Sequence, residues 1–422
     1  MKSLYNIAIW FYALVVRIVA FFNRKVRLMW QGEREAYAKI ESGLREGDRV
    51  VWVHAASLGE FEQGRPLIEK LKRENPEYKI LLTFFSPSGY EVRKNYAGAD
   101  VIAYLPLDTP RNARRFVELV KPEKVVFVKY EFWLNYLAEL RFTGIETYII
   151  SAIFRPNQVF FRWYGGIFRE GLKAFKMLFV QNEESKELLK GIGVENVVVA
   201  GDTRFDRVAD IAAAAKKLEI VESFVNSQLP VLVVGSSWGP DEDLLTRYIN
   251  ERAGRMKMII APHEVREERI KELTSKLTCK YALYTQITDD GLQITDKTQL
   301  SLLIDYDVLV INTIGLLSSV YQYGQVAYIG GGFGVGIHNT LEAAAWGMPV
   351  VFGPNYHKFQ EAKELIEWGA GQSIKNYEEC ARALDEFFEK NEVASKVAAE
   401  YVASHTGATE LIHNAQFIIH NS

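Results

Sequence analysis

A single carboxylate stands just beyond a turn of small residues near the start of the chain. The stretch VWVHAASLGEFEQGRP, Val51 to Pro66, changes from an apolar run to small residues and then reaches Glu60. The apolar run predicts a strand and FEQGRPLIEKLKRE predicts a helix, so Glu60 is expected at a helix N-terminus at the carboxyl edge of a sheet. Two interpretations stay open: an acid that the helix dipole favours, and a general base beside which the small residues let a substrate approach the backbone.

A glycine-rich loop in the second half of the chain offers a different chemistry. In VAYIGGGFGVGIHNTLEAAAWGMPVVFGP, Val326 to Pro354, a predicted strand runs into glycines and NTLEAAAWG then begins a helix. Free N–H groups at that helix start would suit a phosphate, and Glu342, one turn into the helix, could accept hydrogen bonds from sugar hydroxyls. Tight packing alone also explains such glycines, and the spacing matches neither G-x-G-x-x-G nor a P-loop. Together, an acid and a phosphate site suit group transfer from a nucleotide-activated donor.

Buried strands alternating with amphipathic helices must position these residues. The first half contains RVVWVHA, KILLTFF, DVIAYLPL, KVVFVKY, ETYIISA, KMLFVQN and NVVVAG, and the second contains LPVLVVGSS, MKMIIAPHE, YDVLVINT, QVAYIGGG and MPVVFGP. Continuous apolar runs of this length indicate parallel strands covered on both faces. A polar, helix-favouring segment near 208–228 separates the halves. The sequence therefore predicts an α/β protein of two Rossmann-like lobes facing a cleft, with ligands beyond the carboxyl ends of the strands.

Composition excludes several other classes of function. The 422 residues carry 50 basic and 53 acidic side chains, so the net charge of −3 gives no reason to expect a nucleic-acid partner. The two cysteines, Cys279 and Cys380, are far apart, which predicts neither a disulfide framework nor a zinc site and fits a reducing, cytoplasmic setting. The acidic cluster Asp241, Glu242 and Asp243 invites a metal site, but it follows a proline at a predicted helix start, and no metal is expected.

The N-terminal segment has the composition of a membrane anchor. Leu4 to Phe22 is mostly aliphatic and aromatic, lacks a cleavage site for a signal peptide, and is followed by the cations Arg24, Lys25 and Arg27. Arg17 within the stretch is costly at depth in a bilayer, whereas a helix lying in the interface would relieve that cost. We expect an anchor that spans the bilayer or lies in its interface, and a helix packed on the protein body is the alternative.

Taken together, the motifs resemble the 3-deoxy-D-manno-octulosonic acid (Kdo) transferases of lipopolysaccharide assembly. The resemblance covers nearly the whole chain after the anchor and lies in the order and spacing of several stretches: HAASLGE, YEFWLN, GDTRFD, GSSWGPDED, APHE, NTIGLL and GIHNTLEAAAWGMPVVFGP. It implies an inverting glycosyltransferase of the two-lobed GT-B fold. Such an enzyme moves Kdo from CMP-Kdo to the lipid A precursor (lipid IVA), with CMP-Kdo as donor substrate and no metal or other cofactor.

The resemblance also implies roles for particular residues. Glu60 matches the family's catalytic base, and Glu131 and Arg204 match positions that assist the transition state. Stretches that hold the cytidine monophosphate part of the donor are matched by His263, Glu264, Ile314, Gly315, Leu316, Asn339, Thr340, Leu341 and Glu342.

This sequence departs from the family's pattern mainly on the donor side. The family commonly has aspartate where Asn312 stands, glutamate where Leu316 stands, and arginine beside the histidine of APHE, and the glycine loop is about one residue shorter here. At position 204 the family more often has lysine, and arginine keeps the charge but changes its geometry.

Structural roles remain alternatives to several of these assignments. Arg204 could pair with Asp202 or Asp206, Glu131 could be the partner of a nearby cation, and Trp133 is expected in the core rather than stacked on a ligand. Phe160, Phe161, Trp163 and Tyr164 are candidates either for the core or for a membrane-facing surface.

The expected organisation is an anchor helix at 1–25, an acceptor-binding domain at 26–210 and a CMP-sugar-binding domain at 211–422. The return of the final helix to the N-terminal domain is left open. The expected partners are CMP-Kdo, the lipid A precursor and the inner leaflet of the bacterial inner membrane, with the catalytic domains in the cytoplasm. The alternatives are another GT-B enzyme that uses a UDP-sugar, either a transferase or an epimerase, and a non-catalytic nucleotide-binding protein.

Overall fold

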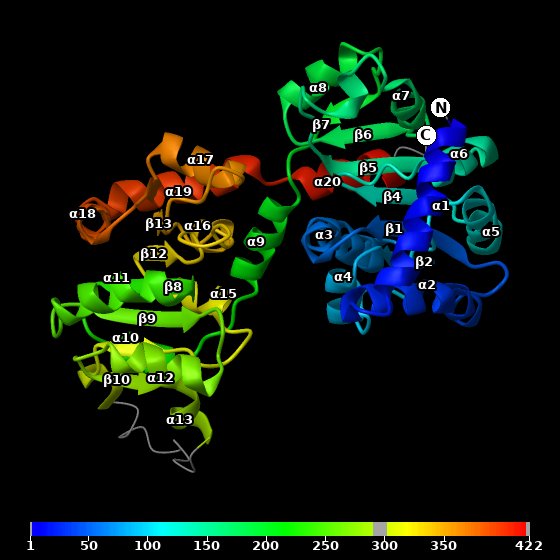
Figure 1. Cartoon of the computed structure of the whole chain (residues 1–422). Helices are drawn as coiled ribbons and strands as arrows, with labels where there is room; N and C mark the ends of the chain where they lie inside the picture. Colours follow the sequence, from blue (N-terminus) through cyan, green and yellow to red (C-terminus); the bar gives the residue numbers. More distant parts are fainter. Residues whose placement is uncertain (1, 290–301, 419–422) are drawn as a thin grey trace. The chain divides into compact units, whose positions relative to one another are not determined.

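The chain forms two compact units. The computed structural model describes residues 2–289 and 302–418 (Figure 1). Unit 1 comprises Met1–Arg207 and His405–Ser422, and unit 2 comprises Val208–Ser404. The first crossing between the units lies within helix α9 (Arg204–Ala213). The chain therefore enters unit 2 once and returns from it to unit 1.

Unit 1 is built on a parallel sheet in the strand order β3-β2-β1-β4-β5-β6-β7. The strands are β1 (Arg49–Ala55), β2 (Tyr78–Phe84), β3 (Val101–Tyr104), β4 (Lys124–Val128), β5 (Glu146–Ala152), β6 (Met177–Val180) and β7 (Val197–Val199). Each corresponds to an apolar run that predicted a strand. Alternate residues of β1 belong to two different cores, with Val50 and Trp52 in one and Val51 and Val53 in the other. Both faces of this sheet are thus buried, as continuous apolar runs predict.

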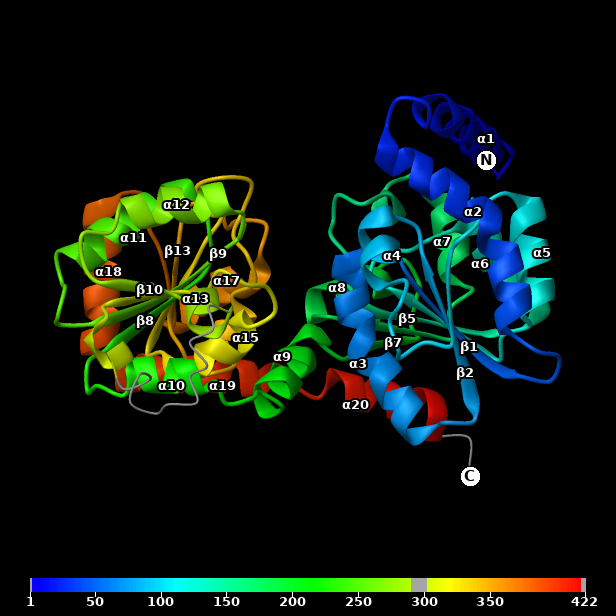
Figure 2. The same cartoon turned by 90° about the horizontal axis from the view of Figure 1, so that it is seen from below.

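Helices cover both faces of the unit 1 sheet (Figure 2). Residues of α2, α5, α6 and α7 share a core with one face, and residues of α3, α4 and α20 share a core with the other. The helices of this unit are α1 (Lys2–Val19), α2 (Arg24–Gly43), α3 (Leu58–Glu74), α4 (Pro87–Arg93), α5 (Pro110–Val120), α6 (Leu134–Thr143), α7 (Gly166–Leu172), α8 (Glu183–Lys190) and α20 (Ala408–His413).

The C-terminal helix α20 packs against α3 of unit 1. Lys70 of α3 forms an ion pair with Glu410 at 2.6 Å, and the ring Nε2 of His413 lies 2.8 Å from the Asn75 side-chain oxygen. Ile412 is fully buried in the core beneath α3. Helix α20 therefore completes the layer that α3 begins.

Unit 2 repeats the architecture with a second parallel sheet, in the order β10-β11-β9-β8-β12-β13-β14. The strands are β8 (Val231–Ser237), β9 (Lys257–Pro262), β10 (Tyr281–Leu283), β11 (Val308–Val310), β12 (Val326–Ile329), β13 (Val350–Phe352) and β14 (Gly371–Ser373). The helices are α10 (Glu219–Val225), α11 (Gly239–Asn250), α12 (Glu267–Ser275), α13 (Tyr284–Asp289), α15 (Leu317–Val320), α16 (Leu341–Ala344), α17 (Gln360–Trp368), α18 (Tyr377–Glu389) and α19 (Asn391–His405). The prediction of two parallel-sheet α/β domains is confirmed.

The sequence predicted an anchor that spans the bilayer or lies in its interface, and the structure does not support the spanning form. Across residues 2–289 and 302–418, no helix combines the length and the apolar character needed to cross a bilayer. Helix α1 ends at Val19, within the apolar stretch, and after a turn Asn23 caps α2 by accepting hydrogen bonds from the N–H groups of Lys25 and Val26. Polar groups also tie α1 to the body of unit 1, because the Tyr5 hydroxyl donates to Asp108 at 2.6 Å.

Glu33 of α2 is a partly buried acid that should make the stability of unit 1 depend on pH. Burial raises the pKa of its carboxyl to about 8, and its charge in turn helps to raise the pKa of Tyr12 and Tyr104. Because this pKa lies above the ordinary value near 4.5, the protonated Glu33 carboxyl makes its full contribution to the free energy of unfolding below pH 4.5. That contribution is lost as the pH rises through 8. We expect Glu33→Gln to remove that loss, so its advantage in melting temperature over the parent grows from pH 5 to pH 9. Each 1 kcal/mol gained in the free energy of unfolding would raise the melting temperature by about 2–4 °C. A difference in melting temperature between variant and parent that does not change with pH would contradict the prediction.

Candidate active site

Two of the predicted acids follow neighbouring strands of unit 1. Glu60 comes five residues after the end of β1, and Glu131 comes three residues after the end of β4. Strands β1 and β4 are adjacent, and the strand order reverses between them, which makes this the topological switch point of the sheet. In open α/β sheets, ligands bind beyond the carboxyl ends of the strands at such a point. The topology thus brings both acids to the edge where a ligand is expected.

Glu60 lies in the first turn of α3 and is only partly buried. The hydroxyl of Ser57, the residue before the helix, donates a hydrogen bond to its carboxylate. A Cβ at Gly59 would meet only the Ser57 hydroxyl oxygen, at 3.9 Å, so the turn is open next to the acid. The side chain is therefore oriented by a hydrogen bond yet remains accessible, as a general base requires.

Glu131 is buried and belongs to a hydrogen-bond chain that runs back into the core. Its carboxylate accepts from the Trp133 indole N–H at 2.6 Å and lies 3.2 Å from Nε2 of the fully buried His54. His54 Nδ1 lies 2.8 Å from the Thr83 hydroxyl, which accepts from the Trp52 indole at 2.7 Å. A hydroxyl donating to Nδ1 leaves the imidazole proton on Nε2, which donates to Glu131. The partners of Glu131 are therefore histidine and tryptophan, and His54 is a contributor that the sequence did not single out.

Arg204 forms the ion pair with Asp202 that the sequence raised as an alternative role. The Arg204 Nη2 lies 2.9 Å from the Asp202 carboxylate. The same carboxylate accepts from the backbone N–H of Arg204 at 2.9 Å and from the Gln63 side chain at 3.0 Å. Asp202 is buried, which by itself would raise its pKa, but Arg204 and these hydrogen bonds hold the pKa below its ordinary value. Arg204 thus has a structural role whether or not it also contacts substrate.

We expect Arg204→Gln to destabilise unit 1 by about 2 kcal/mol at neutral pH, because it leaves a buried carboxylate without its cation. Asp202 has a depressed pKa, so its stabilising contribution is present above the ordinary value of about 3.9 and is lost as pH falls through the lower folded-state value. The difference between variant and parent should accordingly shrink in acid. Urea denaturation at pH 7 and near pH 3 measures it, with Arg204→Lys as the charge-preserving control. A variant as stable as the parent at pH 7 would contradict this reading.

Unit 2 has its own switch point, between β8 and β12, and Asp241 connects the two strand ends. Its fully buried carboxylate accepts from the N–H of Trp238, just after β8, and from the N–H of Gly331, just after β12, each at 2.9 Å. It also accepts from the Tyr328 hydroxyl at 2.9 Å. Burial raises the pKa of Asp241, which the hydrogen bonds only partly offset. Asp241 therefore holds the glycine loop against the end of β8.

The backbone is strained where strands of both sheets end. Lys129, Ser151 and Ser236 have φ of 69°, 50° and 53°, and these residues lie at the carboxyl ends of β4, β5 and β8. Residues other than glycine adopt such angles rarely, and they gather at functional sites. The glycine loop also packs closely against the end of β8, and a side chain at Gly330 would not fit because its Cβ would come within 2.3 Å of the Ser236 carbonyl oxygen.

Three aromatic rings stack at the end of the unit 2 sheet. His263 stacks on Trp238 and on His338, with ring centroids 4.5 Å apart in each pair, and the Trp238 indole N–H donates to His338 Nε2 at 3.1 Å. Burial, and then the charge of His263, lower the pKa of His338, which keeps its imidazole neutral. His263 was predicted from the resemblance, whereas Trp238 and His338 were not. No local pattern marks these two residues, because the stack unites three separate loops.

The remaining predicted donor residues lie at the carboxyl ends of β9, β11 and β12. Glu264 pairs with Arg266, Ile314 is 85% exposed, and Gly315 has a φ of 93° just before Leu316 and α15. Residues 339–342 form a tight turn, in which the Asn339 side chain accepts from the Leu341 N–H at 3.1 Å and donates to Glu342 at 3.0 Å.

The expectation for Glu342 needs a correction. The sequence placed it one turn into a helix, but α16 begins only at Leu341, so Glu342 lies in its first turn. The glycine N–H groups of the loop are already bonded, since that of Gly331 donates to Asp241 and those of Gly334 and Gly336 donate to the Gly331 carbonyl. The Thr340 side chain is fully buried, and its hydroxyl has no hydrogen-bond partner among the described residues.

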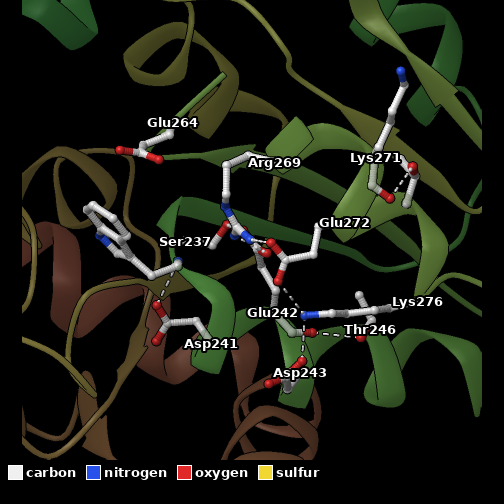
Figure 3. Close-up of polar contacts among 12 residues, drawn as sticks. Ser237, Asp241, Glu242, Asp243, Thr246, Glu264, Arg269, Lys271, Glu272 and Lys276 are labelled. Atoms are coloured by element: carbon white, nitrogen blue, oxygen red, sulfur yellow. Dashed lines mark hydrogen bonds and ion pairs between the residues drawn. The ribbon is translucent and has the colours of Figure 1, made fainter. Parts of the chain in front are cut away.

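The acidic cluster at the start of α11 is divided among different partners (Figure 3). Asp241 holds the glycine loop, Glu242 is buried and pairs with Arg269 at 2.6 Å, and Asp243 pairs with Lys276 at 2.6 Å. Burial raises the pKa of Glu242, and the nearby Arg269 acts in the opposite direction. Within the described parts of the chain, no three His, Cys, Asp or Glu side chains are grouped as metal ligands would be.

Comparison with known proteins shows a similarity to one family of transferases. Residues 30–207 match the family model for 3-deoxy-D-manno-octulosonic-acid transferase (kdotransferase). The 3-deoxy-D-manno-octulosonic acid transferase of Aquifex aeolicus (strain VF5) is 29% identical over 353 residues, covering 82% of this chain and 88% of its own. That of Bordetella pertussis is 26% identical over 409 residues, 90% of each chain. The chain is therefore similar to Kdo transferases, over residues 30–207 to the family model and over most of its length to these relatives. The matched segment includes Glu60, Glu131 and Arg204, and the two relatives extend the similarity into unit 2.

Solved structures share the two-domain fold of this chain. UDP-GlcNAc 2-epimerase from Neisseria meningitidis bound to UDP-GlcNAc aligns with a TM-score of 0.59 at 17% identity, covering 88% of this chain and 100% of its own. A UDP-N-acetylglucosamine 2-epimerase from Listeria monocytogenes aligns with a TM-score of 0.58 at 11% identity, covering 89% and 98%. At such low identity the likeness concerns the fold alone.

Proposed function

We propose that the chain is a glycosyltransferase that moves Kdo from CMP-Kdo to the lipid A precursor in lipopolysaccharide assembly. The observation that carries the proposal is the placement of Glu60 and Glu131 after β1 and β4, the adjacent strands at the switch point, inside the segment that matches the Kdo transferase model. The 3-deoxy-D-manno-octulosonic acid transferase of Bordetella pertussis aligns with 90% of this chain, which supports extending the assignment to both units.

The reaction is a direct displacement at the anomeric carbon of Kdo. The acceptor hydroxyl gives its proton to the Glu60 carboxylate while its oxygen forms the new bond to the anomeric carbon. The bond from that carbon to the phosphate oxygen breaks, its electron pair goes to CMP, and the configuration inverts. Ser57 supports this role because its hydrogen bond holds the Glu60 carboxylate at the start of α3. The proposed chemistry needs no metal.

Glu131 and Arg204 assist the same step in different ways. Glu131 fixes the side chains of His54 and Trp133 beside the end of β1, and these side chains form the surface next to Glu60. Arg204 contributes a positive charge that would stabilise the developing negative charge on the departing phosphate, although it shares that charge with Asp202.

Unit 2 binds the donor in this proposal. The ring of His263, which stacks on Trp238 and on His338, and the exposed segment at Ile314 and Gly315 offer apolar and backbone contacts to the nucleoside. The turn from Asn339 to Glu342 offers N–H groups to the phosphate and a carboxylate to sugar hydroxyls. The buried Thr340 hydroxyl supports this placement, because a buried polar group without a protein partner is costly unless a ligand or water satisfies it.

We further propose that α1 lies in the membrane interface at the cytoplasmic face of the bacterial inner membrane. One helix and the turn that follows expose a group of large apolar side chains, which water disfavours: Leu4, Ile7, Trp10, Phe11, Leu14, Val15, Ile18, Phe21 and Phe22. In the second candidate surface, Trp163 is 91% and Tyr164 51% exposed, whereas Phe160 is core. This arrangement supports membrane contact by Trp163 and Tyr164.

Incubation of the purified chain with CMP-Kdo and a tetra-acylated lipid A precursor, followed by mass spectrometry, tests the function. We expect the acceptor to gain the mass of one or more Kdo residues and CMP to be released. Parallel reactions with UDP-sugars test the alternative of a UDP-sugar transferase or epimerase. Turnover of a UDP-sugar without any Kdo transfer would overturn the proposal.

A further inference from the structure

A cavity of about 350 Å³ opens between α1, α2 and the segment that leads from β3 into α5. Its volume falls in the range that small ligands occupy, about 300–1,000 Å³. Four arginines line it, one from α1, one from α2 and two from α5: Arg17, Arg34, Arg111 and Arg115. The cavity lies wholly within unit 1, and its lining contains none of the residues assigned to the transfer reaction.

The positive charges of this arginine cavity are largely uncompensated. Among described residues, Arg17, Arg34 and Arg111 form no ion pair, and Arg115 reaches only Glu41, at 3.8 Å. Glu33 also lines the cavity, but burial raises its pKa to about 8, so its carboxyl is mostly uncharged at neutral pH. The first turn of the 11-residue helix α5 adds partial positive charge from its N-terminus. The cavity therefore favours an anion that carries more than one negative charge.

Aromatic rings fix the guanidinium groups of two of the arginines. Fixed guanidinium groups favour phosphate over an anion whose negative charge is diffuse. The Arg34 guanidinium lies 5.2 Å from the centre of the Trp30 ring, and that of Arg115 lies 4.0 Å from the centre of the Tyr37 ring. Guanidinium groups fixed in this way can offer paired N–H groups to phosphate oxygens. A phosphate monoester carries a charge between −1.5 and −2 at pH 7, which matches several arginines better than a diester does.

The rim of the arginine cavity is apolar on the α1 side. Trp10 lines the cavity while remaining 59% exposed, and Phe11, Leu14 and Ile18 of the same helix are exposed as well. A soluble phosphate compound would leave these side chains in water. A ligand with an apolar chain attached to its phosphate would cover them, each buried methylene contributing about 0.8 kcal/mol.

We propose that the arginine cavity binds the phosphate monoester of a phosphorylated lipid, with the acyl chains of the lipid lying along α1. The proposal deepens the proposed function, because it names where an acidic group of an acylated acceptor is held in the acceptor-binding unit. It concerns binding alone and can be tested without the donor.

The test measures binding of the full chain to phosphatidylcholine vesicles that contain phosphatidic acid, a phosphate-monoester lipid. The pocket variant is Arg17→Gln with Arg111→Gln, and the control is Arg45→Gln with Arg114→Gln, which removes the same charge from unit 1 at exposed residues that do not line the cavity. An arginine near a phosphate surface contributes about fivefold in affinity, so we expect about a 25-fold loss in the pocket variant and a much smaller loss in the control. Equal losses in the two variants, or none in the pocket variant, would overturn the proposal.

Two further arms separate the possible sources of phosphate and do not depend on a variant. Vesicles of phosphatidylglycerol at the same surface charge should bind more weakly than phosphatidic acid, and glycerol phosphate in solution should not compete. Tight binding of glycerol phosphate would replace the lipid by a soluble ligand and reject the proposal. A photoactivatable phosphatidic acid should crosslink to 10–17, 30–37 or 106–115, and crosslinks confined elsewhere would also reject it. Failure of Kdo transfer would refute the proposed function without altering these binding results.

Discussion

Glu60→Gln is expected to lower the rate of Kdo transfer by about 10²–10⁴-fold, the range lost when a general base is removed. Glutamine keeps the shape of the side chain and can still accept from the Ser57 hydroxyl, so the start of α3 should be preserved. Affinity for CMP-Kdo should stay unchanged, because Glu60 lies in unit 1 and every predicted donor residue lies in unit 2. Steady-state kinetics with the tetra-acylated precursor and a calorimetric titration of CMP-Kdo measure the two effects.

The matched control is Glu62→Gln, on the same helix two residues further along. Glu62 forms a partly exposed ion pair with Arg93 at 2.8 Å, and such pairs contribute about 0–1 kcal/mol. Turnover by this variant should remain within a few-fold of the parent. Near-normal transfer by the Glu60 variant would refute the role of that carboxylate, as would an equal loss in both variants.

Asp241→Ala is expected to destabilise unit 2 by at least about 3 kcal/mol and to weaken donor binding. Alanine leaves three buried donors, the N–H groups of Trp238 and Gly331 and the Tyr328 hydroxyl, without their acceptor, at about 1–3 kcal/mol for each unsatisfied group. The melting temperature should fall by about 6 °C or more for a unit of this size. The glycine loop should loosen with it, so the dissociation constant for CMP-Kdo should rise.

Asp241→Asn separates the hydrogen bonds from the charge. Its side-chain oxygen can accept both N–H groups while its amide donates to the Tyr328 oxygen, so the loop connection is kept and only the Tyr328 hydroxyl proton loses its acceptor. Burial already raises the pKa of Asp241, and losing the charge should therefore cost little. We expect the asparagine variant to retain most of the stability and donor affinity that alanine loses. Equal damage from both variants would show that the charge, not the loop connection, matters.

The strands that the sequence predicts are mainly those buried on both faces of a sheet. All of β1 to β7 coincide with apolar runs, and so do β8, β9, β11, β12 and β13. The two that escaped prediction, Tyr281–Leu283 and Gly371–Ser373, are three-residue edge strands at the two ends of the unit 2 sheet. An edge strand is paired on one side only and needs no continuous apolar run. Its position follows from its neighbour in the sheet, which local sequence does not encode.

The candidate site divides in the same way. Glu60 could be placed because a strand, a turn and a helix follow one another within one short segment, and local order fixes where the acid lies. Asp241 and Trp238 could not, because their partners Gly331 and His338 are about 90–100 residues away in sequence. Position 241 looked like one of three acids at a helix start, and only the tertiary structure gives each acid its own partner.

Composition alone could not decide between a spanning and an interfacial N-terminal helix, for a physical reason. Leu4 to Phe22 is apolar enough to suggest a bilayer span, yet the segment includes Tyr5 and Asn6, which hydrogen-bond to Asp108 and Asn135 of the body. A hydropathy average gives the same weight to residues that face the protein and to residues that face outward. The division of the helix into these two sides becomes apparent only when Asp108 and Asn135 have been placed.

The return of the chain to unit 1 has a consequence for how the protein is made. A bacterial ribosome adds about 5–20 residues per second, and about 200 residues of unit 2 are synthesised between Arg207 and His405. For roughly 10–40 s, then, the nascent chain carries α3 without the helix that covers it, with the site of Ile412 open to water. Unit 2 is synthesised as one continuous segment during that interval, whereas the core of unit 1 must wait for α20 to be added. A chaperone that shields apolar surface during synthesis would find its target on the half of the protein that emerges first.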